Sequence, residues 1–134
     1  MGMDLHGNNP ITEEGEYFRN NIWSWGPLAD YIKQVAPDLA GKCRSWSVNE
    51  GDGLDAADAL ELAARLQTEI DSGRCERYAR TYARTYEDRA NGTLSGVCDV
   101  IDEFFEGATY RPFNVQNVRN FVTFLRGCGG FQIW

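Results

Sequence analysis

A short acidic stretch offers oxygen atoms that could bind a cation. Glu50, Asp52, Asp55 and Asp58 follow one another closely, and Asn49 adds an amide oxygen. Calcium binds several such oxygens at once. The EF-hand pattern, however, needs them at alternate positions, with a central glycine and a glutamate at the twelfth, and no register here satisfies it. The sequence therefore favours a solvated acidic loop in which Asp55 caps a helix, and we expect no metal site.

Few residues are available for catalysis. His6 is the single histidine, so a Cys–His or Ser–His pair would depend on it. The segment Gly51-Asp52-Gly53 has too few glycines for a phosphate loop, and its aspartate would repel an anion. No spacing singles out a carboxylate pair among the 20 acidic residues. We expect a protein without cofactors that is not an enzyme. An enzyme with a pocket assembled from distant residues stays the third alternative.

The one basic stretch of the chain covers residues 74–92, with five arginines against three acidic residues. On a helix over residues 74–89, Arg77, Arg80 and Arg84 cluster opposite the tyrosines and alanines. Arginine binds phosphates and tyrosine stacks on bases, so this helix is the candidate for nucleic-acid binding. The same pattern fits a helix that packs its tyrosines into the core and leaves its arginines in solvent, which we favour.

Four tryptophans are more than a small domain readily hides. Tryptophan is also enriched at the energetic centres of protein interfaces. We expect at least one of Trp23, Trp25 and Trp46 to be partly exposed, and the alternative is that all three lie in the core. The candidate partner-binding residues are Glu50, Asp52, Asp55, Asp58, Trp23, Trp25 and Trp46.

Composition indicates a globular protein. The 134 residues carry a net charge of −7, with 43% hydrophobic and 25% charged residues, and we expect one domain over residues 1–134. Such acidity disfavours nucleic acid and suits either solubility or a basic partner surface.

The cysteines indicate a reducing compartment. Cys43, Cys75, Cys98 and Cys128 are spread along the chain, and no pair has the C-x-x-C spacing of zinc sites. We expect no signal peptide, and the sequence holds no apolar run long enough to span a membrane. We therefore expect a cytoplasmic protein with free, buried thiols and no membrane contact.

The hydrophobic spacing predicts a mainly α fold of the α+β class, with about four to five helices. The expected helices run from Pro27 to about Ala36, from a cap at Asp55 to about Ser72 with Gly73 closing it, over residues 74–89, from Leu94 to Phe105, and from a cap at Asn114 to Gly127. Residues 3–6 and 131–134 alternate in polarity, and we expect them to pair as a short two-stranded sheet that joins the terminal segments.

Several motifs resemble a family of small hypothetical proteins of bacteriophages and prophages. They are the start MGMD, the stretch EGEYFRNN followed by Trp23 and Trp25, the segment PLADY, the loop DGLDA and the ending FV-x-FLR-x-CGGF. Some relatives in that family carry a C-x-x-C-x-G-x-G zinc knuckle. Here residues 89–109 hold Cys98 alone, so zinc does not carry over.

The resemblance implies a small phage accessory protein in the cytoplasm of a bacterial host. We expect non-catalytic binding to a host protein or complex, in its sharpest form as an anti-CRISPR or other anti-defence inhibitor. The alternative is a nucleic-acid-associated phage protein that uses helix 74–89. A homodimer is also open, because an exposed tryptophan or an edge strand can bind a second copy.

Overall fold

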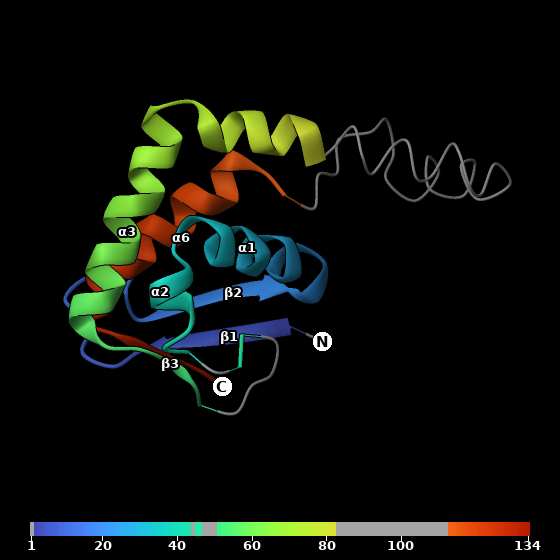
Figure 1. The fold of residues 1–134 in the computed structure, drawn as a ribbon. Helices are drawn as coiled ribbons and strands as arrows, with labels where there is room; N and C mark the ends of the chain where they lie inside the picture. The colour runs from blue at the N-terminus through green and yellow to red at the C-terminus, as the bar shows by residue number, and fades with distance from the viewer. Residues whose placement is uncertain (1, 44, 47–50, 83–112) are drawn as a thin grey trace, which may run out of the picture.

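Helices predominate in the computed structural model, which describes residues 2–43, 45–46, 51–82 and 113–134. Four strands form an antiparallel sheet in the order β2-β1-β4-β3 (Figure 1). The fold is therefore mainly helical and of the α+β class, as the sequence predicts. The sheet is larger than the two strands expected.

The terminal segments pair as predicted. Strand β1 (Gly2–Gly7) runs antiparallel to β4 (Phe131–Ile133), with Leu5 opposite Ile133. One further strand lies on each side of this pair. Strand β2 (Tyr17–Asn21) lies along β1, and β3 (Gly53–Leu54) lies along β4. Gly53, which composition places in a loop, thus belongs to the sheet, because the backbone of β4 offers it a partner.

Two helices begin at the predicted cap residues, Asp55 and Asn114, whose side chains accept backbone N–H groups of the first turn. Asp55 Oδ1 accepts a hydrogen bond from the Asp58 N–H at 2.8 Å and begins α3 (Ala56–Asp71). Asn114 does the same for α6 (Val115–Gly127) through the Asn117 N–H at 2.8 Å. Gly73 has a φ of 81° and ends α3 in the left-handed region that favours glycine.

The predicted start of the first helix at Pro27 is wrong. Helix α1 spans Ile22–Val35, because Asn21 Oδ1 accepts the Ser24 N–H at 2.9 Å and begins the helix earlier. Pro27 therefore lies inside α1, where it removes one main-chain hydrogen bond. A short helix, α2 (Pro37–Ala40), follows α1 directly. Residues 74–82 are helical, and residues 83–89 and the predicted helix 94–105 lie outside the described residues.

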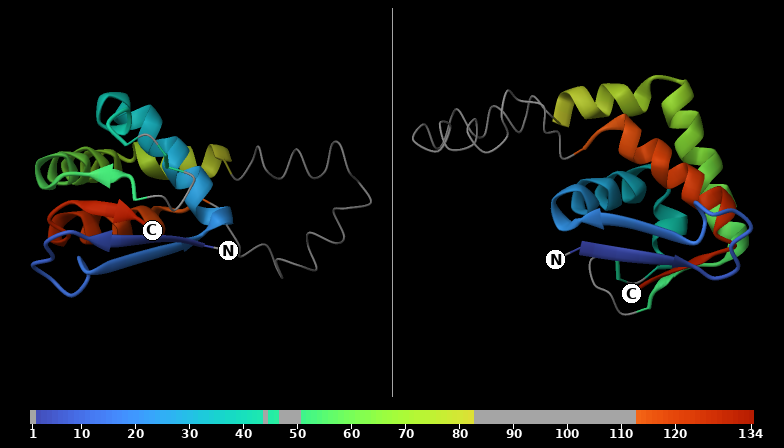
Figure 2. Two further views of the ribbon diagram at one scale, coloured as in Figure 1. Left: turned by 90° about the horizontal axis from the view of Figure 1, so that it is seen from below. Right: turned by 180° about the vertical axis from the view of Figure 1, so that it is seen from behind.

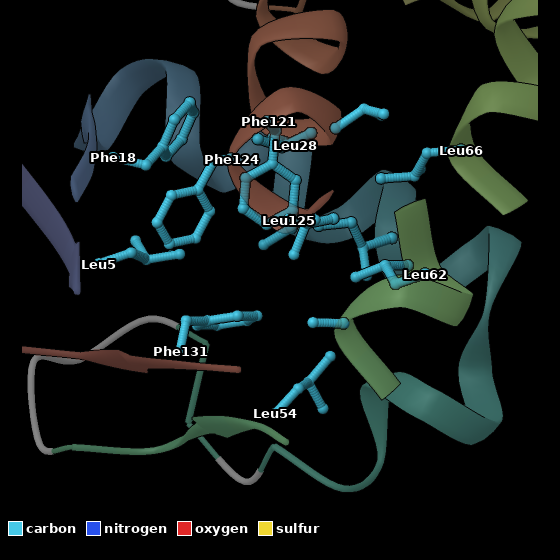
Figure 3. Packing of buried hydrophobic residues seen from close by; sticks show 14 of the residues in the cluster. Leu5, Phe18, Leu28, Leu54, Leu62, Leu66, Phe121, Phe124, Leu125 and Phe131 are labelled. Atoms are coloured by element: carbon cyan, nitrogen blue, oxygen red, sulfur yellow. The ribbon is translucent and has the colours of Figure 1, made fainter. Parts of the chain in front are cut away.

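The helices cover one side of the sheet, and the hydrophobic core lies between the two layers (Figures 1 and 2). Phe18, Leu5 and Ile133 face one another across β2, β1 and β4, and they point into this core. Figure 3 shows Leu5, Phe18 and Phe131 directed toward side chains of α6. The apolar stripe of that helix is buried, and it consists of Val118, Phe121, Val122 and Leu125.

Aromatic rings make up much of the core. Phe121 lies 5.1 Å from Phe18 and 6.2 Å from Phe131, measured between ring centroids. Each of these distances falls in the range at which aromatic pairs attract beyond simple burial. Phe121 on α6 therefore joins the edge strand β2 to the C-terminal strand β4.

The loop of residues 8–16 is fastened to the end of α6 by its backbone. Ile11 N–H donates to the Gly127 carbonyl at 2.8 Å, and Asn9 N–H donates to that of Cys128 at 3.0 Å. Gly15 permits the close approach, since a Cβ there would lie 2.0 Å from the Gly127 carbonyl oxygen. These contacts place the end of α6 beside the β1–β2 connection. The chain that follows α6 therefore enters the sheet as β4.

A matched pair of substitutions in β4 tests this arrangement. We expect Phe131→Ala to lower the free energy of unfolding by about 3–5 kcal/mol, because the ring is fully buried. Gln132→Ala, on the exposed side of the same strand, should change it by less than about 0.5 kcal/mol. Equilibrium denaturation in urea measures both, and equal losses would show that β4 does not lie against the core.

Candidate functional site

The side of the sheet turned away from the helices carries polar and aromatic side chains. In β1 the burial alternates, so Met3 and Leu5 are buried while His6 is exposed. The partner strands follow the same alternation. We call this surface the outer sheet face, and its side chains are Asp4, His6, Tyr17, Arg19, Gln132 and Trp134.

The strand register arranges these residues in two rows. Tyr17, His6 and Gln132 lie opposite one another across β2, β1 and β4. Arg19 lies opposite Asp4. Trp134 continues this second row, because its backbone N–H donates to the Asp4 carbonyl at 2.7 Å. Side chains from three separated parts of the chain thus become neighbours.

Two planar groups lie against β1. The Tyr17 hydroxyl donates a hydrogen bond to the Asp4 carboxylate, and this bond raises the pKa of Tyr17. The Arg19 Nε lies 3.6 Å from the same carboxylate. A Cβ on Gly2 would lie 2.7 Å from that Nε, so the Arg19 side chain passes over a glycine. Tyr17 and Arg19 therefore both contact the Asp4 carboxylate across the β1–β2 pair.

Trp134 adds the largest ring to this surface. Its side chain is 58% exposed, and its Nε1 donates to Gln132 Oε1 at 3.3 Å. Gly51, with a φ of 90°, leaves room beneath the indole, since a Cβ there would lie 2.7 Å from the ring. The indole thus rests on the backbone at the β3 side and keeps an open face.

The acidic candidates do not gather into one site. Asp55 caps α3, and Asp58 pairs with Lys42 Nζ at 3.1 Å. Asp52 lies near the thiol of Cys43, whose pKa burial raises to about 11, with a further contribution from the Asp52 charge. Glu50 lies outside the described residues. Within the described ranges, no group of three His, Cys, Asp or Glu side chains is placed to hold a metal ion.

The tryptophan candidates divide between core and surface. Trp23 is 70% exposed, which confirms that at least one of the three is accessible. Trp25 and Trp46 are only 2% and 3% exposed, so their assignment to partner binding is wrong. Each satisfies its indole N–H internally, Trp25 with the Trp46 carbonyl and Trp46 with the Ala40 carbonyl. Because both indoles are buried and their N–H groups are already bonded within the protein, neither side chain is available to a partner.

The tyrosines of the helix over residues 74–82 pack inward as we favoured. Tyr78 lies 4.6 Å from Tyr31 and 4.7 Å from Phe113 between ring centroids. Tyr82 lies 6.3 Å from Phe113. These rings are partly buried against the core, so they are poorly placed to stack on bases.

The arginines of the same helix face solvent. Arg77 and Arg80 are exposed, and Arg80 pairs with Glu76 at 3.0 Å. Arg84 lies outside the described residues. An arginine that already contacts a carboxylate loses part of its attraction for phosphate, which weakens the nucleic-acid candidate.

Three cysteines are buried as free thiols, namely Cys43, Cys75 and Cys128, and Cys98 lies outside the described residues. Burial raises the pKa of all three. They are therefore protonated at neutral pH, whereas a nucleophilic cysteine reacts as the thiolate.

Sequence reasoning missed the outer sheet face. One signal was present in the alternation of Tyr17, Phe18 and Arg19, which is typical of a strand with one buried side. That strand has one neighbour, β1, and the rest of the face comes from β4 at the other end of the chain, so the alternation alone does not identify the face.

No protein-family model, curated protein or solved structure matches the chain. The likeness to phage proteins therefore depends on the sequence motifs alone. Within the described residues, no helix is both long and apolar enough to cross a bilayer.

Asp38 on α2, which lies outside the outer sheet face, forms an exposed ion pair with Arg65 on α3. Arg65 donates to both oxygens of Asp38, at 2.6 and 3.0 Å, and its Nε donates to Glu61 at 3.1 Å. The hydrogen bonds from Arg65 lower the pKa of the Asp38 carboxyl from 3.8 to about 2. Because the pKa is lowered in the folded state, the stabilisation is present above pH 3.8 and is lost as the pH falls through about 2.

Replacing the arginine tests this assignment. We expect Arg65→Gln to return the pKa of Asp38 toward 3.8, as followed by NMR titration of the carboxyl carbon. Arg74→Gln, which breaks the pair with Glu69 instead, should leave Asp38 unchanged. A wild-type Asp38 that titrates near 3.8 would contradict the bidentate pair.

Proposed function

We propose that this protein acts by non-catalytic binding to another protein, and that the outer sheet face is its binding surface. The observation that carries the proposal is the grouping of Trp134, Tyr17 and Arg19 on one open side of the sheet. Tryptophan, tyrosine and arginine are the residue types that dominate binding energy in protein interfaces. Each lies against neighbouring strands, so little side-chain entropy is lost on binding.

The chemistry of the described residues supports binding over catalysis. The cross-strand neighbours of His6 are Tyr17 and Gln132, and neither is the serine or cysteine that a histidine base activates. The buried thiols are protonated at neutral pH. Exposed aromatic and guanidinium side chains spread over several strands suit a macromolecular partner better than a small substrate, which needs a concave pocket.

The phage-like motifs suggest where such a binder acts. A small accessory protein of a phage works in the cytoplasm of its bacterial host, and we propose a host protein or complex as the partner. In its sharpest form the partner is a CRISPR effector or another defence complex, which binding inhibits. The acidity of the chain supports this version, because nucleic-acid-binding effectors present basic surfaces.

The nucleic-acid alternative has weaker support. Arg74 and Arg80 already contact Glu69 and Glu76, at 2.9 and 3.0 Å. The tyrosines of that helix pack toward Phe113. Of the candidates, Arg77 keeps an exposed side chain without an ion pair to a described residue. One arginine neutralises too few phosphates for firm binding at physiological salt.

Site-specific photocrosslinking in a bacterial host tests the proposal. We expect a photoreactive amino acid in place of Gln132 to crosslink one host protein. The same amino acid in place of Lys33, exposed on α1, serves as the matched control and should not. The purified partner should then bind wild type, and Trp134→Ala should weaken that binding by about 2 kcal/mol.

Two results would count against the proposal. One is crosslinking of the same protein from both positions, which would indicate non-specific contact. The other is unchanged affinity of the purified partner for Trp134→Ala, with circular dichroism showing that the variant folds.

A further inference from the structure

Strand β2 forms one edge of the sheet, and its backbone can accept a further strand there. The sheet order β2-β1-β4-β3 gives β2 a single neighbour, β1, among the described strands. In the right panel of Figure 2, which shows the molecule from behind, no helix of the described residues lies in front of β2. An edge of this kind presents N–H and C=O groups that can pair with a strand of another chain.

The hydrogen-bond pattern identifies the backbone groups that face outward. Gly7 N–H donates to the Glu16 carbonyl at 3.1 Å, which continues the β1–β2 register as a hydrogen-bonded pair. Such pairs alternate along an antiparallel ladder, so Phe18 also turns its N–H and C=O toward β1. The backbone groups of Tyr17 and Arg19 therefore point to the open edge.

The side chains beside these groups leave the edge uncovered. The Tyr17 hydroxyl reaches the Asp4 carboxylate of β1, and the Arg19 side chain passes over Gly2 of the same strand. Both side chains thus lean toward β1. The Arg19 carbonyl accepts a hydrogen bond from Asn20 Nδ2 at 3.0 Å, and a carbonyl oxygen has a second lone pair for a further donor.

The sequence of β2 complements itself in one antiparallel register. If the Phe18 residues of two copies lie opposite one another, Tyr17 of each copy faces Arg19 of the other. These facing residues carry the outward backbone groups and exchange hydrogen bonds, and a ring opposite a guanidinium is a favourable pair. Glu16 then faces Asn20, so no like charges are opposed.

The neighbouring registers are less favourable. Centring the pair on Arg19 would oppose two guanidinium groups, and like charges directly opposite one another are destabilising. Centring it on Tyr17 would pair fewer residues of β2. The register centred on Phe18 is therefore the one that the sequence favours.

Two strongly exposed hydrophobic residues lie on the segments that flank β2 in the sequence. Ile11 is 78% exposed in the loop that joins β1 to β2, and Trp23 is 70% exposed in the first turn of α1. Antiparallel pairing brings the loop end of one β2 beside the α1 end of the other. Exposed apolar surface at both ends of the shared edge favours association.

We infer that two copies of this protein associate through β2, antiparallel and centred on Phe18, so that two four-stranded sheets join into one. The contact is isologous, because each copy contributes the same strand. It goes beyond the proposed function and does not rest on it, since the two outer sheet faces lie side by side on the same side of the joined sheet. The charge of −7 on each copy opposes association, so the dimer should weaken at low salt.

NMR on the whole protein tests this pairing without a substitution. In a mixture of isotope-labelled and unlabelled copies, we expect a contact between the Hα atoms of the two Phe18 residues, which are close in a non-hydrogen-bonded pair. The amides of Tyr17 and Arg19 should exchange with solvent more slowly as the protein concentration rises. The Phe18 amide, which faces β1 within each copy, is the matched control and should change far less.

Two substitutions at one position separate the backbone from the side chain. Arg19→Pro removes the outward N–H and obstructs the added strand, so it should raise the dimer dissociation constant at least about tenfold in sedimentation equilibrium. Arg19→Ala keeps that N–H and should raise the constant by less than about fivefold. Circular dichroism checks that both variants fold. If Arg19→Pro does not, the NMR contact and the amide exchange decide.

Several results would overturn the inference. A protein that stays monomeric as its concentration rises is one, and a dimer without the Phe18 contact is another. Equal losses in the two folded Arg19 variants would also count against it. If the Tyr17 and Arg19 amides become protected only when a crosslinked host partner is added, a strand of that partner occupies the edge. The inference then fails and the proposed function stands, as it also does for a monomer that still crosslinks one host protein.

Discussion

Burial of the C-terminal strand between β1 and β3 is the constraint on which this structure depends. Phe131 and Ile133 have no measurable exposure, and the backbone of β4 bonds to a neighbour on each side. Without it, the two-residue strand β3 would lose its partner, and β1 would keep β2 alone. A two-stranded hairpin is marginal in water. The aromatic contacts of Phe121 with Phe18 and Phe131 join the same strands to α6.

The position of β4 also creates the outer sheet face. Neighbouring residues of a strand point to opposite sides, so a register that buries Leu5, Phe18 and Ile133 must expose His6, Tyr17 and Gln132. A shift of one residue would exchange the two sets and place charged groups in the core. The outer sheet face is thus a geometric consequence of packing the core. Its side chains are those of the alternate strand residues, which point away from the core.

Much of the helical part could be predicted because its signals are local. Asp55, Asn114 and Gly73 act within one turn of the helix ends that they define. The start of α1 was missed because two local signals competed, and the Asn21 cap prevailed over Pro27. Strand β2 was missed because a lone alternating segment does not reveal the strand beside it.

The sequence by itself determined the acidity, the helix caps, the apolar stripe of α6 and the pairing of the terminal segments. Only the tertiary structure decided that Trp25 and Trp46 are buried while Trp23 and Trp134 are exposed. It also separated Asp52, Asp55 and Asp58 into different local roles and brought Asp4, Arg19 and Trp134 together. The physical reason is distance along the chain. Caps and stripes depend on residues within a few turns, whereas a sheet surface depends on strands whose register no local pattern contains.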